Sequence, residues 1–301
     1  MLIDTLGGSI SGSAEVNWAS LVSWKTDINL QNIQPGLQWP EAEGDISGQL
    51  ITDGHLTENG GWVVDVPTID INGVFRNYPL LVQGALKADD VRGVGEPHLN
   101  ISQLTINHGD NGLAVSGELN KEWDLNVNID FPELSDSVPD VHGKLIGNVA
   151  LTGELTKPRI DLDIDALGLQ LPKKATLNKA SIEGYIVPSP TIDADLSIKL
   201  LDGKYQKQVL NDLIIRFSGK EQAHKLQIDL NSNVIDSHLV FKGSLDRTQG
   251  WTGELSEADV ITEIGPWNLD KKADLAYDIK KRRIICSGKL LESGKNGALF
   301  E

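Results

Sequence analysis

Apolar and polar residues alternate along most of this chain. Leu125, Val127 and Ile129, for example, are separated by asparagines. Successive side chains of a β-strand point to opposite faces, so each such segment has one apolar and one polar face. This pattern is typical of an antiparallel sheet that is covered on one side only. The clearest alternating segments are 125–131, 160–165, 191–200, 226–230 and 275–279.

One segment is compatible with either a helix or a strand. Within residues 209–217 the apolar positions fit a helical stripe, but Leu213, Ile215 and Phe217 fit a strand equally well. We predict a strand because both flanking segments alternate. Prolines fall between the alternating runs, where turns belong. With strands of about six to eight residues, the chain would supply roughly 20 strands, in a single continuous element over residues 1–301.

A second regularity is a glycine followed two residues later by leucine or isoleucine. Glycine within a strand usually marks a bulge, a bend or a close approach of backbone. Repeated from strand to strand, it could curve the sheet continuously, although each glycine alone is equally compatible with an ordinary turn. The glycines are Gly48, Gly84, Gly117, Gly143, Gly153, Gly184, Gly243, Gly253 and Gly288.

The apolar face of such a sheet has to be buried against something. Helices are nearly absent, so the cover would be a second sheet, the sheet curling onto itself, or a ligand. Aromatic residues, which a sandwich core of this size would recruit, make up only 5% of the chain. We therefore predict an all-β fold: a long, curled, mostly antiparallel sheet that forms a half-pipe groove, a β-taco, with an aliphatic interior suited to a lipid tail. The residues predicted to line it are Leu125, Val127, Ile129, Ile160, Leu162, Ile164, Ile192, Leu196, Ile198, Leu226, Ile228 and Leu230.

The net charge of the chain restricts the classes of molecule that it can bind. The formal net charge is -16, which repels phosphate backbones and makes nucleic acid an unsuitable partner. The same acidity argues against a basic patch that binds anionic lipid head groups. No apolar run approaches the roughly 20 residues that span a bilayer, and the first residues lack the pattern of a signal peptide. Either the protein is cytosolic, or the chain is part of a longer exported one.

The side chains that carry chemistry are scattered. Cys286 is the single cysteine, which excludes a disulfide framework or a multi-thiolate zinc site. There is no nucleophile elbow, phosphate-binding glycine loop or zinc-protease motif, and the six histidines show no metal-binding spacing. We therefore predict no catalytic residue, metal or cofactor. The histidines are His55, His98, His108, His142, His224 and His238.

Two further groups of residues have a structural interpretation. Asp161, Asp163 and Asp165 resemble a calcium cluster, but they lack the glycine and distal glutamate of an EF-hand loop. On a strand they would form a solvated acidic row, which resists aggregation. The seven tryptophans could stack on sugars, but we favour a role at the ends of the apolar groove. They are Trp18, Trp24, Trp39, Trp62, Trp123, Trp251 and Trp267.

Several phrases of the sequence are similar to the TamB family, a group of AsmA-like, bridge-like lipid transfer proteins. The similarity is to the middle-to-late periplasmic region of that family and is clearest over residues 117–285. The residues after Ile285 depart from it, because family members carry a second cysteine near Cys286. The phrases are 219–230, 241–247, 251–255 and 264–269.

The resemblance implies a place and partners for the chain. It implies a periplasmic location, as part of a protein anchored in the inner membrane by a helix that this chain lacks. It further implies a partnership with a TamA-like outer-membrane barrel, made through regions absent here. It implies roles in phospholipid movement to the outer membrane, in outer-membrane protein assembly and in autotransporter secretion.

Three functions compete at this stage. The leading hypothesis is a passive conduit for phospholipid acyl chains, without enzymatic activity. The second is a chaperone-like scaffold that receives unfolded outer-membrane protein clients by strand addition. The third is a structural or adhesive β-solenoid with a filled interior.

Overall fold

The computed structural model describes residues 2–287 and 292–293. Its contacts divide the chain into two compact units. Unit 1 comprises Met1–Pro139 and Lys144–Pro158, and unit 2 comprises Asp140–Gly143 and Arg159–Glu301. Most of the tail that departs from the family pattern lies outside the described residues. A single continuous element over residues 1–301 stays a prediction, and each unit is described here by itself.

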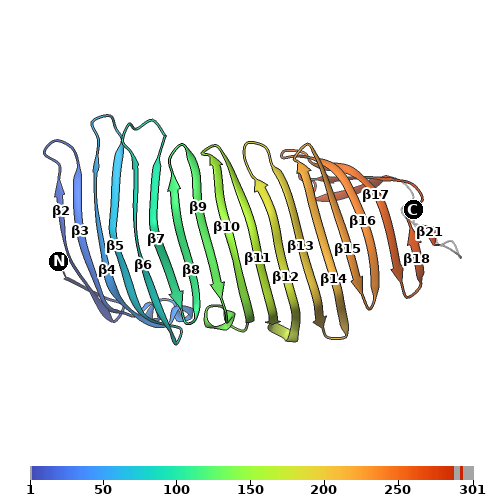
Figure 1. Ribbon diagram of the computed structural model, residues 1–301, viewed down its shortest axis with the longest axis horizontal. Helices are drawn as coiled ribbons and strands as arrows, with labels where there is room; N and C mark the ends of the chain where they lie inside the picture. The colour runs from blue at the N-terminus through green and yellow to red at the C-terminus, as the bar shows by residue number, and fades with distance from the viewer. Residues whose placement is uncertain (1, 288–291, 294–301) are drawn as a thin grey trace. The chain divides into compact units, whose positions relative to one another are not determined.

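Unit 1 is a run of antiparallel hairpins (Figure 1), in which every strand from β1 to β10 pairs with the next. Three short 3-10 helices, η1 (Pro35–Leu37), η2 (Pro40–Ala42) and η3 (Leu134–Asp136), lie in the connections. The strands are β1 (Leu2–Thr5), β2 (Gly8–Asn17), β3 (Ser23–Ile33), β4 (Gly44–Leu56), β5 (Trp62–Phe75), β6 (Tyr78–Asp90), β7 (His98–His108), β8 (Asn111–Leu119), β9 (Glu122–Phe131) and β10 (His142–Glu154).

Unit 2 continues with the same hairpin pattern, and each strand from β11 to β17 pairs with the next. One 3-10 helix, η4 (Pro172–Lys174), precedes β12. The strands are β11 (Lys157–Leu171), β12 (Ala175–Val187), β13 (Asp193–Tyr205), β14 (Gln208–Lys220), β15 (Ala223–Ser232), β16 (Ile235–Asp246), β17 (Gly250–Thr262), β18 (Gly265–Asn268), β19 (Ala273–Asp278), β20 (Arg283–Ser287) and β21 (Glu292–Ser293).

The predicted all-β, antiparallel fold is confirmed. The ambiguous segment 209–217 belongs to β14, so the strand interpretation is correct. In β9 the polar side chains are exposed and the apolar ones half-buried at every position, as the alternation requires. Within both units the sheet stays open and does not close into a barrel.

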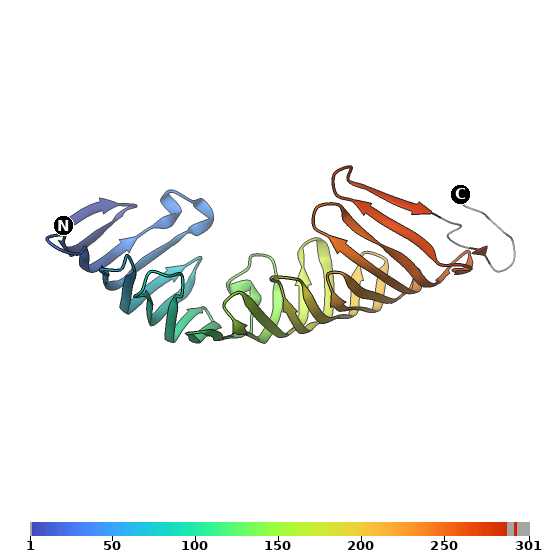
Figure 2. The same ribbon diagram turned by 90° about the horizontal axis from the view of Figure 1, so that it is seen from above.

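The sheet of unit 2 forks at β17. The first half of β17, from Gly250 to Leu255, pairs with β19, and its last residues pair with β18. A bulge at Val240/Phe241 precedes the fork. The small core of Leu255, Ala258 and Ala273 lies where the two branches separate. Within this unit, the strands after the fork (orange to red in Figure 2) are turned relative to the yellow strands before it. Residues on both sides of the fork line the pocket described below.

Two of the repeated glycines show the structural role of this glycine series. Gly117 and Gly184 have φ values of 124° and 130°, which side chains other than glycine rarely adopt. A Cβ at Gly184 would overlap the carbonyl oxygen of Asp195 on the neighbouring strand. These glycines therefore permit a close approach of backbone. Gly117 also borders a register shift, because its partner Ile101 lies at the irregularity between Ile101 and Leu104.

Candidate functional site

Aliphatic side chains stand in register across the strands of unit 2. Cross-strand partners point to the same face of a sheet, so the pairings define continuous rows. The isoleucine row consists of Ile164, Ile182, Ile198, Ile215, Ile228 and Leu239. The leucine row, two residues away on each strand, consists of Leu162, Gly184, Leu196, Phe217, Leu226 and Phe241.

Most of the predicted lining residues of unit 2 fall in or beside these two rows. Ile160 pairs with Ile186 next to the leucine row. Leu230 pairs with Leu213 next to the isoleucine row. Ile192 lies just before β13 and belongs to the pocket described below. The register therefore brings these predicted side chains onto one face.

Unit 1 has an equivalent face. Val127 stands between Val115 and Val149, and Ile129 pairs with Leu113. Leu125 pairs with Gly117 and Leu151. The row through Val127 consists of Ile28, Leu50, Ile69, Gly84, Leu104, Val115, Val127 and Val149.

These rows remain partly open to solvent. All twelve predicted lining residues are half-buried. The accessible surface is 18358 Å² for a chain of 32.7 kDa, whereas a compact monomer of that mass exposes about 12,400 Å². The chain therefore exposes more surface than a compact protein of its mass, and part of each predicted lining side chain is left uncovered.

The opposite face carries paired charges. Asp161 accepts from Arg159 at 2.7 Å, and Asp165 lies 3.0 Å from Lys179. Asp161 and Asp165 of the acidic row are thus each paired with a basic neighbour, whereas Asp163 stands opposite Glu183. Among the described residues no group of three or more His, Cys, Asp or Glu side chains could hold a metal ion.

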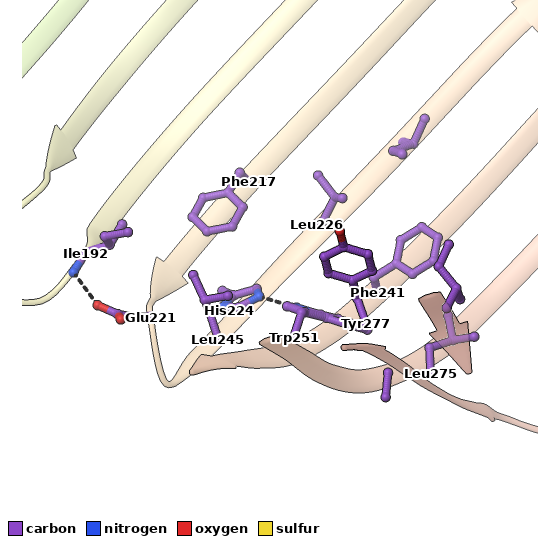
Figure 3. Close-up of a pocket in the computed structure, with 13 residues that line it drawn as sticks. Ile192, Phe217, Glu221, His224, Leu226, Phe241, Leu245, Trp251, Leu275 and Tyr277 are labelled. Carbon is purple, nitrogen blue, oxygen red and sulfur yellow. Dashed lines mark hydrogen bonds between the residues drawn. The ribbon is translucent and has the colours of Figure 1, made fainter. Parts of the chain in front are cut away.

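The apolar face of unit 2 contains a pocket of about 550 Å³ (Figure 3). This volume is within the range of small-molecule sites, roughly 300–1,000 Å³. Of the predicted residues, Ile192, Leu226 and Ile228 line it. The other lining residues are Phe217, Glu221, His224, Phe241, Leu245, Trp251, Leu275, Ala276, Tyr277 and Ile284.

Trp251 forms one wall of the pocket and is fixed by a hydrogen bond. Its Nε1 donates to His224 Nε2 at 2.7 Å, while His224 Nδ1 lies 3.1 Å from the Lys220 carbonyl oxygen. Because the indole N–H can only donate, His224 Nε2 is the acceptor of this hydrogen bond. A Cβ at Gly243 would overlap the indole ring, so this glycine makes room for Trp251.

Glu221 ties the neighbouring turns together at the rim of the pocket. Its carboxylate accepts from Arg247 at 2.6 and 2.7 Å and from the Ile192 amide at 3.1 Å. Its backbone N–H donates to the Ile192 carbonyl, and its own carbonyl accepts from Leu245. The hydrogen bond from Arg247, followed by that from Ile192, holds the pKa of Glu221 below its ordinary value. The side chain is only 8% exposed.

Apart from Trp251, for which the sequence favoured a role at an end of the groove, the aromatic and polar residues of the pocket were missed by the sequence prediction. Phe217 and Phe241 could have been found, because they occupy the apolar phase of alternating segments. Tyr277 and Ile284 could not, because they reach the pocket only through the pairing of β19 with β17 across the fork. Glu221 lies in a turn and has no sequence signal.

Comparison with known proteins identifies the family. A family model described as "TamB, N-terminal domain" matches residues 1–288. This chain belongs to the TamB family. The match includes the first hundred residues, beyond the 117–285 where the resemblance is clearest. The description places it in the N-terminal domain rather than in the middle-to-late region that the sequence phrases indicated.

A curated relative supports this assignment. The chain is 30% identical over 281 residues to the translocation and assembly module subunit TamB of Haemophilus influenzae, a match that covers 93% of this chain. The chain spans only 21% of that relative. No solved structure gave a significant match. In the described part of the chain, none of the helices has the length and apolar character to cross a membrane.

Proposed function

We propose that this chain is a segment of a periplasmic hydrophobic groove that carries phospholipid acyl chains between the inner and outer membranes. The observation that supports it most is the pair of aliphatic rows in unit 2, which run across six strands and stay half-buried. A packed opposing layer would bury them fully. A guest hydrocarbon is the cover that such rows lack.

The energetics suit transport rather than tight binding. Each CH₂ removed from water contributes about 0.8 kcal/mol, so an acyl chain of about 16 carbons faces a barrier of roughly 10 kcal/mol in water. Uniform rows of Ile and Leu offset most of this cost. They hold no polar clamp, so the tail can slide from one strand to the next. The chain itself needs no catalytic group or cofactor for this role.

The remaining parts of the proposal rest on the family. The name of the Haemophilus influenzae relative connects it with a translocation and assembly module. We propose that this chain likewise functions within an inner-membrane-anchored periplasmic protein that partners a TamA-like outer-membrane barrel. Support of outer-membrane protein assembly and autotransporter secretion would follow from that partnership.

The test is a charge placed inside the groove, compared with the same charge outside it. Leu196 lies in the leucine row, and its neighbour Ser197 points to the opposite face beside Arg216. Leu196→Asp is expected to reduce lipid transfer between vesicles or membranes at least tenfold, because the tail would have to pass a carboxylate. Ser197→Asp is the matched control and should transfer lipid as the wild type does.

The folded state of both variants is compared by circular dichroism. Equal transfer by two folded variants would overturn the proposal. Loss of folding in Leu196→Asp, with full stability in Ser197→Asp, would show that the row is a sealed core, and this too would contradict the groove. Retained lipid transfer with lost client assembly would favour the chaperone-like scaffold.

A further inference from the structure

The turn between β19 and β20 is strongly basic in an acidic protein. Lys280, Lys281, Arg282 and Arg283 follow one another directly. Residues 1–158 contain seven Lys and Arg against 22 Asp and Glu, whereas residues 159–301 contain 20 against 21. The average charge of the chain therefore conceals a local cluster of positive charge in unit 2. We call residues 280–283 the basic turn.

The basic turn carries more positive charge than its neighbouring carboxylates, Asp246 and Asp278, can balance. Within the described residues, Lys280, Arg282 and Arg283 form no ion pair, and Lys281 only approaches Asp278 at 3.9 Å. Asp278 instead accepts the backbone N–H groups of Lys280 and Lys281, at 2.9 and 3.0 Å. This carboxylate fixes the turn and leaves the side chains exposed.

The basic turn adjoins the apolar pocket. Tyr277 and Ile284 pair with each other and both line the pocket. Arg283 directly precedes Ile284 in β20, so its side chain points to the other face of that strand, whereas residues 280–282 lie in the turn before it. Ile284 is 76% exposed, which places a large apolar side chain in solvent directly after the basic turn.

The turn also lies on the rim that Glu221 ties together. The Ile279 N–H donates to the Gln249 carbonyl in the turn between β16 and β17. The nearby carboxylates already accept hydrogen bonds: Glu221 accepts from Arg247, and Asp246 accepts from Thr248 and Gln249. The rim therefore carries four basic side chains against the carboxylates of Asp246 and Asp278.

We propose that the basic turn binds the phosphate of an anionic phospholipid whose acyl chain lies in the adjoining pocket. The inference rests on the proposed function and deepens it by adding a head-group site. An apolar pocket beside a cationic turn fits a molecule with a tail and an anionic head. A single lipid is favoured over a bilayer surface, because the acidity of residues 1–158 opposes approach to an anionic membrane.

The experiment compares two lysine pairs on turns of the same unit. Lys280→Gln/Lys281→Gln removes two charges from the basic turn. Lys173→Gln/Lys174→Gln removes two from the turn between β11 and β12 and is the matched control. Binding of monomeric dihexanoyl phosphatidylglycerol is measured by calorimetry at low salt, with dioctanoylglycerol as the lipid without phosphate.

The basic-turn variant should bind phosphatidylglycerol about 25-fold more weakly, at roughly fivefold for each charge, and should bind dioctanoylglycerol unchanged. The control variant should match the wild type for both lipids. Added salt should weaken phosphatidylglycerol binding by the wild type, because it screens exposed charges.

Three results would overturn the inference. One is equal phosphatidylglycerol binding by both variants while dioctanoylglycerol still binds, which leaves the groove proposal intact. Another is binding of inorganic phosphate as tight as that of the lipid, which would mean a site for free anions. The last is binding to phosphatidylglycerol vesicles without binding to the monomeric lipid, which would mean a membrane-docking turn. Failure of the wild type to bind either lipid would instead contradict the proposed function itself.

Discussion

Units 1 and 2 are built from the same hairpin pattern, yet they differ in chemistry. Both present rows of paired aliphatic side chains on one face. Unit 2 adds the aromatic residues Phe217, Phe241, Trp251 and Tyr277, which surround its pocket. A pocket at the first strands of unit 1 is smaller, about 190 Å³, and has no aromatic wall. A repeated strand pattern can therefore support a uniform apolar face in one region and a pocket with aromatic walls in another.

The rims of the two units are fixed by different interactions. In unit 1, Asn111 and His108 join the loop before β10 through hydrogen bonds to Ser137 and to the backbone of Glu133. In unit 2 the Glu221–Arg247 ion pair joins neighbouring turns instead. Hydrogen bonds between amide, hydroxyl and backbone groups depend little on salt or pH, whereas a carboxylate–guanidinium pair responds to both. The predictions below test these two kinds of rim interaction separately.

The largest expected effect is on unit 1. Asn111 is 2% exposed; its amide nitrogen donates to the Glu133 carbonyl and Ser137 Oγ, and its Oδ1 accepts from the Glu133 N–H. Asn111→Ala should lower the free energy of unfolding by about 2–4 kcal/mol, because it leaves buried polar groups without partners. Urea denaturation measures it. Asn126→Ala, on the exposed face of β9, is the control and should cost less than about 0.5 kcal/mol. Equal costs would contradict a buried rim network.

A smaller effect is expected at a glycine of the leucine row. Gly184→Ala should destabilise unit 2 by about 1–3 kcal/mol, because alanine is strained at its positive φ and meets the Asp195 carbonyl. Gly203→Ala is the control, since a Cβ there meets only the side chains of Leu177 and Leu210. Thermal unfolding compares the two. A stable Gly184→Ala would show that close strand approach is not required.

Trp251→Phe should cost about 1 kcal/mol of stability, the worth of a typical hydrogen bond, because only the indole Nε1 reaches His224. It should also widen the pocket and weaken binding of a short lipid severalfold. Isothermal calorimetry with dioctanoylglycerol measures this. Trp18→Phe, at an exposed position of unit 1, is the control. Unchanged binding by Trp251→Phe would remove Trp251 from the site.

The smallest effect is the pH dependence of the unit 2 rim. Glu221 has a depressed pKa, so the ion pair contributes stability above the ordinary carboxyl pKa of about 4.3. That contribution is lost as the pH falls through the lower pKa of the folded state. Glu221→Gln should therefore reduce stability at pH 7 and flatten its fall below about pH 4. Denaturation at pH 7 and pH 3 measures it. Parallel pH curves for wild type and variant would contradict the assignment.

The sequence predicted the faces of the sheet well, and for a physical reason. Alternation is a local property, so Val127 in unit 1, and Leu162 and Ile198 in unit 2, could each be assigned to the apolar face of their own strand from their neighbours alone. The pocket could not be predicted, because β19 contributes to it by pairing with β17, although β18 lies between these two strands in the sequence. The basic turn was missed for another reason: a net charge of -16 is an average over two halves of different charge.

The central claim is that the aliphatic rows face a lipid rather than a layer of protein. It is tested most directly by placing a photoreactive benzoylphenylalanine at position 196, in the leucine row, or at position 197, on the opposite face. After irradiation in cells, mass spectrometry of the purified chain should find a phospholipid adduct at position 196 and none at 197. Adducts at both positions, or a protein cross-link alone at 196, would contradict it.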